Sequence, residues 1–104
     1  MIYHLCQIYF YKPDTCIKRD IEDFFSLHHA GGRLIDFDYN NIVFSIGEFR
    51  SRSLAQDPNS INGKILKIEK DSKKIKVLSM GHRNVQGLFF DKESNFIYAS
   101  EHGP

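Results

Sequence analysis

The sequence lacks several features that would assign it to a familiar class. Tryptophan is absent, and the 104 residues include two cysteines and three prolines. The 14 basic and 13 acidic residues nearly cancel, so there is no basic field to attract nucleic acid and no acidic tail. No apolar run approaches the roughly 20 residues needed for a transmembrane segment. A chain of this length is one small domain or part of a larger one.

Export signals and cysteine or zinc motifs are also scarce. The N-terminal stretch is apolar but lacks the basic start and small-residue cleavage site of a signal peptide. We therefore expect no signal peptide in this chain, which leaves the compartment of a longer parent protein open. Cys6 and Cys16 could face each other across a hairpin, but two cysteines decide neither a disulfide nor a compartment. Neither a Cys-x-x-Cys pair nor a His-Glu-x-x-His motif is present, which argues against a zinc site.

Short apolar segments separated by turn signals predict an all-β chain. Lys74 to Val77 alternates polar and apolar residues, as expected for a strand that is wet on one face. The only helix we expect is Asp20 to Leu27, and a polar loop should run from Gly47 to Asn62. The expected strands are Ile2 to Tyr11, Arg33 to Asp38, Ile42 to Ile46, Lys64 to Ile68, Lys74 to Leu78, Gly87 to Asp91 and Phe96 to Ser100.

An internal repeat relates the end of the chain to its middle. Each copy begins a hairpin, and two further strands lie between the copies, so the repeating unit has four strands. Four-stranded units at about this spacing are typical of β-propeller blades. We expect residues 28–80 to form one blade, residues 81–104 the first half of the next, and residues 1–27 to belong to preceding strands of open extent. A shift of 55 positions carries Gly32 onto Gly87, Asp36 onto Asp91, Asn40 onto Asn95, Ile42 onto Ile97 and Ser45 onto Ser100.

The meander predicts which loops lie together. In an up-and-down blade, the link into the first strand and the loop leaving the second strand lie on the same rim, which here would gather residues 27–32, 47–49, 81–86 and 101–104. Because the chain ends directly after this cluster, and because a propeller needs several blades to close, we expect a truncated protein. Polar groups gathered on one rim suit a central active site, although their spacing supports no transition-metal site. They are His28, His29, Glu48, His82, Arg83, Asn84, Gln86, Glu101 and His102.

The rim motifs resemble a known family. Gly81-His82-Arg83-Asn84-Val85-Gln86-Gly87-Leu88 followed by Glu101-His102-Gly103-Pro104 resembles the soluble glucose/sorbosone dehydrogenases that depend on pyrroloquinoline quinone (PQQ), also called aldose sugar dehydrogenases. Residues 55–68, 29–34 and 45–48 are similar to further motifs of that family, so the resemblance covers about residues 28 to 104. It implies a six-bladed β-propeller, of which this chain would hold about one and a half to two blades.

The resemblance also implies roles for single residues. His29 falls on the catalytic base that takes the proton of the anomeric hydroxyl while hydride passes to the quinone, a task that suits imidazole because its pKa lies near working pH. Arg83 falls on the arginine beside the reacting quinone oxygen, where a cation stabilises developing negative charge. Asn84 falls on a cofactor-contacting position, where an amide can both donate and accept. Gly103 and Pro104 fall where two backbone carbonyls hold the calcium that binds the cofactor.

Considered without the resemblance, these residues have plainer interpretations. His29 would be a loop histidine, Arg83 a surface ion-pair residue, and the final Gly-Pro pair a terminal turn. The chain also departs from the family pattern. Val85 replaces a proline and would loosen the turn that aims Arg83 and Asn84. Glu48 stands where aspartate is usual, and His28 stands where some glucose-oxidising members have aspartate, so sugar specificity stays open.

The resemblance therefore implies part of a PQQ- and calcium-dependent dehydrogenase whose partners are an aldose sugar and an electron acceptor. The family is usually periplasmic or secreted. We expect the isolated chain to be inactive, because most blades and the basic residues that grip the cofactor are missing from it. The alternative is a non-catalytic propeller that binds other proteins, and an independent small β-domain is a third hypothesis. The oligomeric state stays open.

Overall fold

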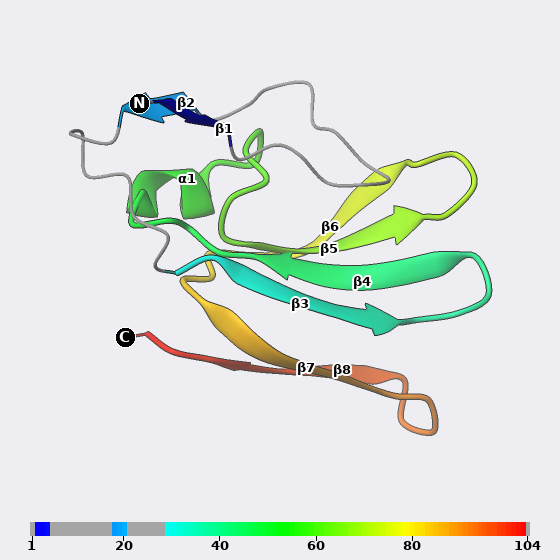
Figure 1. Cartoon of the computed structure of the whole chain (residues 1–104). Helices are drawn as coiled ribbons and strands as arrows, with labels where there is room; N and C mark the ends of the chain where they lie inside the picture. Colours follow the sequence, from blue (N-terminus) through cyan, green and yellow to red (C-terminus); the bar gives the residue numbers. More distant parts are fainter. Residues whose placement is uncertain (1, 5–17, 21–28, 104) are drawn as a thin grey trace.

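The structure, a computed structural model, describes residues 2–4, 18–20 and 29–103 (Figure 1). Its largest unit is a four-stranded antiparallel sheet whose strands neighbour one another in chain order, and two further antiparallel pairs accompany it. The sheet consists of β3 (Gly31–Asp36), β4 (Asn41–Ile46), β5 (Lys64–Glu69) and β6 (Ile75–Met80). The pairs are β1 (Ile2–His4) with β2 (Lys18–Asp20), and β7 (Val85–Asp91) with β8 (Phe96–Glu101); helix α1 (Arg52–Gln56) lies between β4 and β5.

The all-β prediction is confirmed. Each expected strand within residues 31–101 is present, and its ends lie within two residues of the expected ones. The four-stranded unit followed by the first hairpin of another is the arrangement expected for about one and a half blades of a propeller. The 55-residue repeat is also present in the fold, because it carries β4 onto the full length of β8.

Two local expectations need correction. The helix expected from Asp20 to Leu27 does not begin at Asp20, which pairs with Ile2 in a strand; residues 21–27 lie outside the described residues. The loop expected from Gly47 to Asn62 contains the five-residue helix α1. Backbone bonds close this single turn, Leu54 N to Ser51 O at 2.9 Å among them. One turn has no apolar periodicity to reveal it in the sequence.

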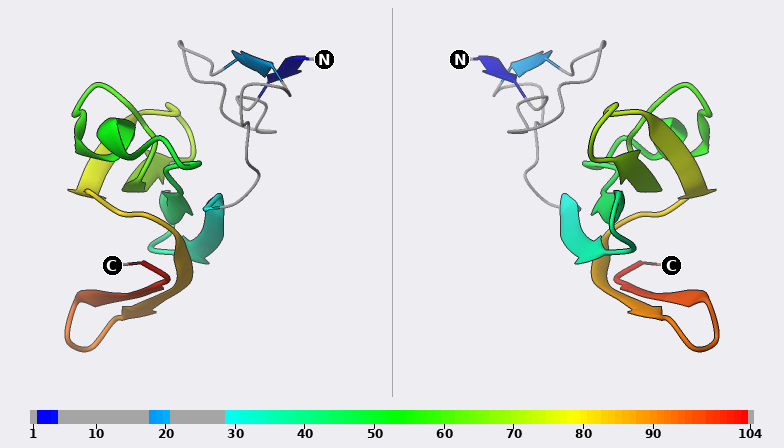
Figure 2. Two further views of the ribbon diagram at one scale, coloured as in Figure 1. Left: turned by 90° about the vertical axis from the view of Figure 1, so that its left-hand side faces the viewer. Right: turned by 90° about the vertical axis from the view of Figure 1, so that its right-hand side faces the viewer.

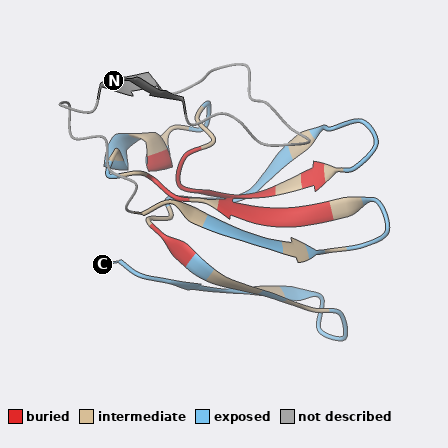
Figure 3. Ribbon diagram, in the orientation of Figure 1, coloured by how far each residue is buried: buried red, intermediate tan, exposed pale blue. Residues whose placement is uncertain are grey.

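Strand β4 is buried over residues 42–45 because it pairs with β3 on one side and β5 on the other (Figure 3). Its side chains alternate between two apolar clusters, one on each face of the sheet. The first cluster lies on the face away from β7 and consists of Ile42, Phe44, Leu66 and Ile68. Burial of these side chains is the main contribution to the stability of the sheet.

The second cluster joins the sheet to the β7–β8 hairpin. Val43 and Ile65 pack with Val85, the first residue of β7, and Val85 is 0% exposed. The rings of Phe37 and Phe90 extend this contact with centroids 4.5 Å apart. Figures 1 and 2 show the result, with β7 running beside β3. The Val85 side chain is therefore anchored between the two units, while the looser turn expected from the missing proline stays a prediction.

Candidate active site

The rim segments lie together in the fold. Residues 29–31 cross residues 47–49, where Gly47 N donates to Ala30 O at 2.8 Å and Phe49 N donates to His29 O at 3.2 Å. The crossing requires glycine, because a Cβ on Gly47 would lie 1.6 Å from the His29 carbonyl oxygen. Glu48 N donates to Arg83 O at 3.0 Å, which brings in the third segment. The fourth segment contains His102, whose backbone N–H bonds Asn84 O in the third segment.

The Arg83–Asn84 segment is fixed from two sides. The backbone N–H of His102 donates to Asn84 O at 3.1 Å. The Asn84 side chain is 6% exposed, and its Oδ1 accepts a hydrogen bond from Gly31 N at 3.1 Å. With Oδ1 used in this way, the Asn84 amide nitrogen is the group available to donate to a ligand.

His29 and Glu48 form a close pair. His29 Nδ1 lies 2.6 Å from Glu48 Oε1, and the two side chains are 12% and 1% exposed. The same Oε1 accepts from Arg50 N at 3.1 Å. An ionised carboxylate only accepts hydrogen bonds, so it selects the tautomer with the proton on Nδ1 and leaves Nε2 as the basic nitrogen.

Glu48 is a candidate site residue to which sequence reasoning gave no role. Its carboxylate is buried, and its second oxygen, Oε2, has no hydrogen-bond partner among the described residues. The available signal was its position directly after Ile46-Gly47, on the rim that also carries His29. Pairing of two residues 19 positions apart depends on the crossing at Gly47, which spacing alone does not reveal.

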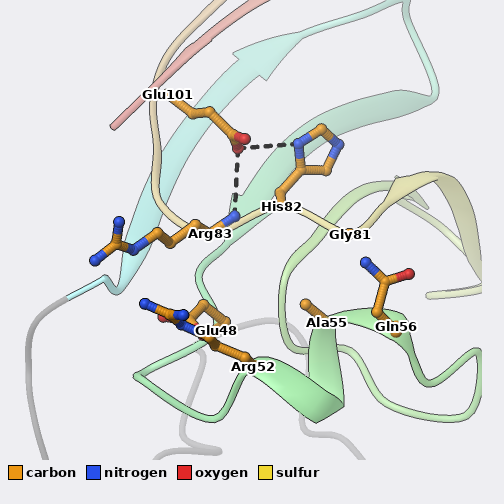
Figure 4. A pocket seen from close by; sticks show the side chains of 8 residues that line it. All are labelled: Glu48, Arg52, Ala55, Gln56, Gly81, His82, Arg83 and Glu101. Carbon is orange, nitrogen blue, oxygen red and sulfur yellow. Dashed lines mark hydrogen bonds and ion pairs between the residues drawn. The ribbon is translucent and has the colours of Figure 1, made fainter. Parts of the chain in front are cut away.

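Two neighbouring hollows open at this rim. His29 and Asn84 come together in the first, whose other lining residues are Ala30, Gly31, Arg50, Gln86 and His102. Arg83 instead lines the second hollow, together with Glu48, Arg52, Ala55, Gln56, Gly81, His82 and Glu101 (Figure 4). The two hollows are adjacent because Arg83 and Asn84 are consecutive.

Arg83 is placed to meet an anionic group. Its Nε is buried and has no hydrogen-bond partner among the residues that the structure describes. Its aliphatic stem lies against Gly103, where an added Cβ would approach Arg83 Cδ to 2.9 Å. A guanidinium without a protein partner can bind a carboxylate or another anionic group. The structure thus places Gly103 beside Arg83, whereas Pro104, His28 and both cysteines lie outside the described residues.

Lys64 supports the loop behind this rim and was not expected from the sequence. It is 0% exposed, and its ammonium donates to the carbonyl oxygens of Leu54, Ala55 and Asn62 at 3.0, 2.8 and 2.7 Å. Burial lowers the pKa of Lys64, and the Asp57 carboxylate partly opposes this shift. By bonding these three carbonyls, the ammonium of Lys64 holds together the loop that follows Glu48.

Membrane and metal features are limited in the part of the chain that the structure describes. There, no helix is long and apolar enough to cross a membrane. In the same residues, no group of three or more His, Cys, Asp or Glu side chains could hold a metal ion. A calcium site built from backbone carbonyls would not involve such a group.

The blade-like sheet, with its polar motifs on one rim, has counterparts among known proteins. The family model described as glucose/sorbosone dehydrogenase matches residues 14–104. The chain belongs to this family. The aldose sugar dehydrogenase YliI of Escherichia coli (strain K12) is 32% identical over 91 residues, which cover 74% of this chain and 24% of that protein.

Two crystal structures are similar to the chain. The soluble aldose sugar dehydrogenase of Escherichia coli in its apo-form matches with a TM-score of 0.64 and 28% identity, over 77% of this chain and 27% of that one. An oxidoreductase (glucose dehydrogenase) from Thermus thermophilus matches with a TM-score of 0.64 and 33% identity, over 74% of this chain and 28% of that one. The chain therefore spans about a quarter of the length of these relatives.

Proposed function

We propose that this chain supplies the proton-accepting part of the active site of a PQQ-dependent aldose dehydrogenase. The observation that carries the proposal is the 2.6 Å pair of His29 and Glu48, placed in one hollow with Asn84. Family membership favours sugar oxidation as the chemistry. A base that faces a sugar hydroxyl is the group that such an oxidation requires.

In this mechanism His29 Nε2 accepts the proton of the anomeric hydroxyl. Glu48 holds the ring with Nδ1 protonated and stabilises the imidazolium that forms. When bound, PQQ would supply the hydride acceptor. The His29–Glu48 pair is mostly shielded from water, so its hydrogen bond is stronger than it would be at an open surface.

Three neighbouring residues would hold the cofactor. Asn84, fixed through its Oδ1 by Gly31, would donate from its amide nitrogen. Arg83 would bind an anionic edge of the quinone through its guanidinium and stabilise negative charge there. The backbone carbonyls of Gly103 and Pro104 would bind calcium, which prefers oxygen ligands.

The remaining parts of the activity belong to the complete protein. We infer that the isolated chain is inactive, because relatives about four times as long contribute further blades and further cofactor contacts. For the whole protein we propose an aldose and an electron acceptor as partners, and a periplasmic or secreted location.

Reconstitution tests this proposal. The protein translated from the complete open reading frame that encodes this chain would be titrated with PQQ and calcium while a dye reports electrons released from aldoses. Saturable dye reduction that requires both additions is the expected result. A folded protein that binds no quinone would overturn the proposal and favour the protein-binding propeller in its place.

A further inference from the structure

His82 and Glu101 are titratable residues of the rim motifs that the proposed chemistry does not use. They contact each other directly, since His82 Nδ1 lies 3.0 Å from Glu101 Oε2 (Figure 4). The same oxygen accepts a hydrogen bond from the backbone N–H of Arg83 at 3.3 Å. One carboxylate oxygen therefore ties the end of β8 to the segment that carries Arg83 and Asn84.

The other side of the His82 ring reaches the first sheet. His82 Nε2 lies 2.7 Å from the hydroxyl of Ser79, a residue of β6. Because the carboxylate of Glu101 accepts from Nδ1, the hydroxyl donates to Nε2 in the neutral ring. The His82 backbone N–H also donates to Gly63 O at 3.0 Å. Both ring nitrogens and the backbone are thus engaged, which fixes the ring between the two units of the fold.

We propose that Glu101 and His82 are positioning residues that hold Arg83 and Asn84 in register with Gly103; this inference rests on the function proposed above. Neither residue lines the hollow that contains His29 and Asn84, so neither is assigned contact with the sugar. Arg83 and Asn84 follow His82 directly, and Gly103 lies two positions after Glu101.

The geometry explains why both motifs need this contact. The stem of Arg83 lies against Gly103, and the backbone N–H of His102 bonds Asn84 O, so the two segments must keep a fixed separation. The His102 bond joins backbone to backbone and would persist without Glu101. The Arg83 N–H has no acceptor other than Glu101 among the described residues, so loss of the carboxylate frees that peptide. Figure 4 shows Glu101, His82 and Arg83 arranged around one wall of the second hollow.

Substitutions of Glu101 separate this role from a general effect on stability. Glu101→Met removes the acceptor at similar length, whereas Glu101→Gln keeps a side-chain oxygen that can accept both bonds. Glu93→Met is the matched control, because Glu93 is an exposed residue in the turn of the same hairpin. All variants would be made in the protein from the complete open reading frame.

Two readouts are measured: amide hydrogen exchange of Arg83 without cofactor, and the dissociation constant for PQQ in the presence of calcium. For Glu101→Met we expect exchange of the Arg83 amide to rise about tenfold and PQQ binding to weaken about tenfold, with amides of β4 unchanged. Glu101→Gln should restore both values to within about threefold of the parent. Glu93→Met should match the parent protein.

An unchanged Arg83 exchange rate together with unchanged PQQ affinity in Glu101→Met would overturn the inference. If all amides of that variant exchange rapidly, the variant has lost its fold and Glu101→Thr provides the second test. Threonine suits the end of a strand, and its short side chain cannot reach the Arg83 N–H. Faster exchange at Arg83 alone in that variant supports the inference, and no change overturns it. A parent protein that binds no quinone refutes the proposed function, while the exchange measurement still decides whether Glu101 fixes Arg83.

Discussion

A buried carboxylate decides which nitrogen of the candidate base is free. Glu48 is 1% exposed and directs the ring of His29 through a single short contact. The sequence predicts His29 from its motif, and it shows Glu48 only as a longer replacement for aspartate. The pair itself depends on the backbone crossing of Gly47 over residue 29, which requires the folded sheet.

Substitution of Glu48 tests its control over His29. In Glu48→Gln the side chain keeps its shape but can either donate or accept, so the tautomer of His29 is no longer fixed. We expect kcat for aldose oxidation to fall by about 10²-fold or more, with KM changed much less. Steady-state kinetics of the reconstituted protein measures this, with Glu93→Gln as the control. A kcat equal to that of the parent would contradict the assignment.

Lys64 makes a contribution to stability that no sequence pattern predicts. Lys64→Met keeps the stem but leaves the carbonyl oxygens of Leu54, Ala55 and Asn62 without their shared donor. Leu54 O and Ala55 O still accept from Asp57 N and Gly81 N, so Asn62 O is the acceptor left without a donor among the described residues. We expect the free energy of unfolding to fall by about 1–3 kcal/mol, the usual cost of leaving a buried polar group unpaired. Urea denaturation measures it, and Lys76→Met on the exposed face of β6 is the control. Equal losses in the two variants would show that the buried ammonium has no special role.

At the scale of the elements, an aspartate side chain accepts hydrogen bonds in the turn of each of the two equivalent hairpins. In the β3–β4 turn, Asp38 Oδ1 accepts from the backbone of Asn40 and Asn41 at 2.9 and 2.8 Å. In the β7–β8 turn, Asp91 accepts from Glu93 N at 3.1 Å and from the Ser94 hydroxyl at 2.7 Å. Aspartate favours such turns because its short side chain replaces a backbone acceptor. Turn signals of this kind are the reason that the strands could be predicted from the sequence.

These turns predict an acid-dependent loss of stability. Hydrogen bonds from the Asn41 side chain and from the backbone hold the pKa of Asp38 below its usual value of 3.8. The folded state then binds fewer protons than the unfolded state. The stabilisation is therefore complete above pH 3.8 and is lost as pH falls through the lower folded pKa.

The variant Asp38→Asn removes this titration but keeps a side-chain oxygen. We expect its free energy of unfolding to depend less on pH below about 4 than that of the parent. Denaturation curves at several acid pH values measure the slope, with Asp71→Asn in the β5–β6 turn as the control. An acid slope unchanged by Asp38→Asn, or flattened equally by the control, would refute this account.

Elements without a pattern of their own escaped prediction. Helix α1 is a single turn, closed by backbone bonds rather than by an apolar stripe. The expected helix at Asp20 was wrong at its first residue, because pairing with Ile2 overrides a weak local preference. Long alternating strands joined by clear turns were predictable, since each carries its own periodicity.

For the whole molecule, the central structural feature is the junction between the sheet and the β7–β8 hairpin. Val85, Val43 and Ile65 form its buried centre, and Ser45 Oγ donates to Val85 O at 3.2 Å beside them. The junction sets the relative positions of His29 and Asn84, which come from different units. The meander of strands correctly indicated that these residues lie on one rim, but not the packing that holds them there.

Val85→Ala tests the junction. Removal of two methyl groups from a fully buried side chain should lower the free energy of unfolding by about 1–3 kcal/mol. Val77→Ala on β6 is the matched control, because Val77 is 40% exposed. Urea denaturation measures both variants. Similar losses in the two would show that the junction is not a packed core.

The central claim is that His29 is the base of an aldose dehydrogenase, and one pair of measurements tests it most directly. In the protein from the complete open reading frame, the dissociation constant for PQQ with calcium and kcat for aldose oxidation would be compared between the parent and His29→Ala. The account predicts cofactor binding within about threefold of the parent and a kcat lower by about 10² to 10⁴-fold. A His29→Ala protein that binds PQQ and oxidises aldoses at the parental rate would contradict it.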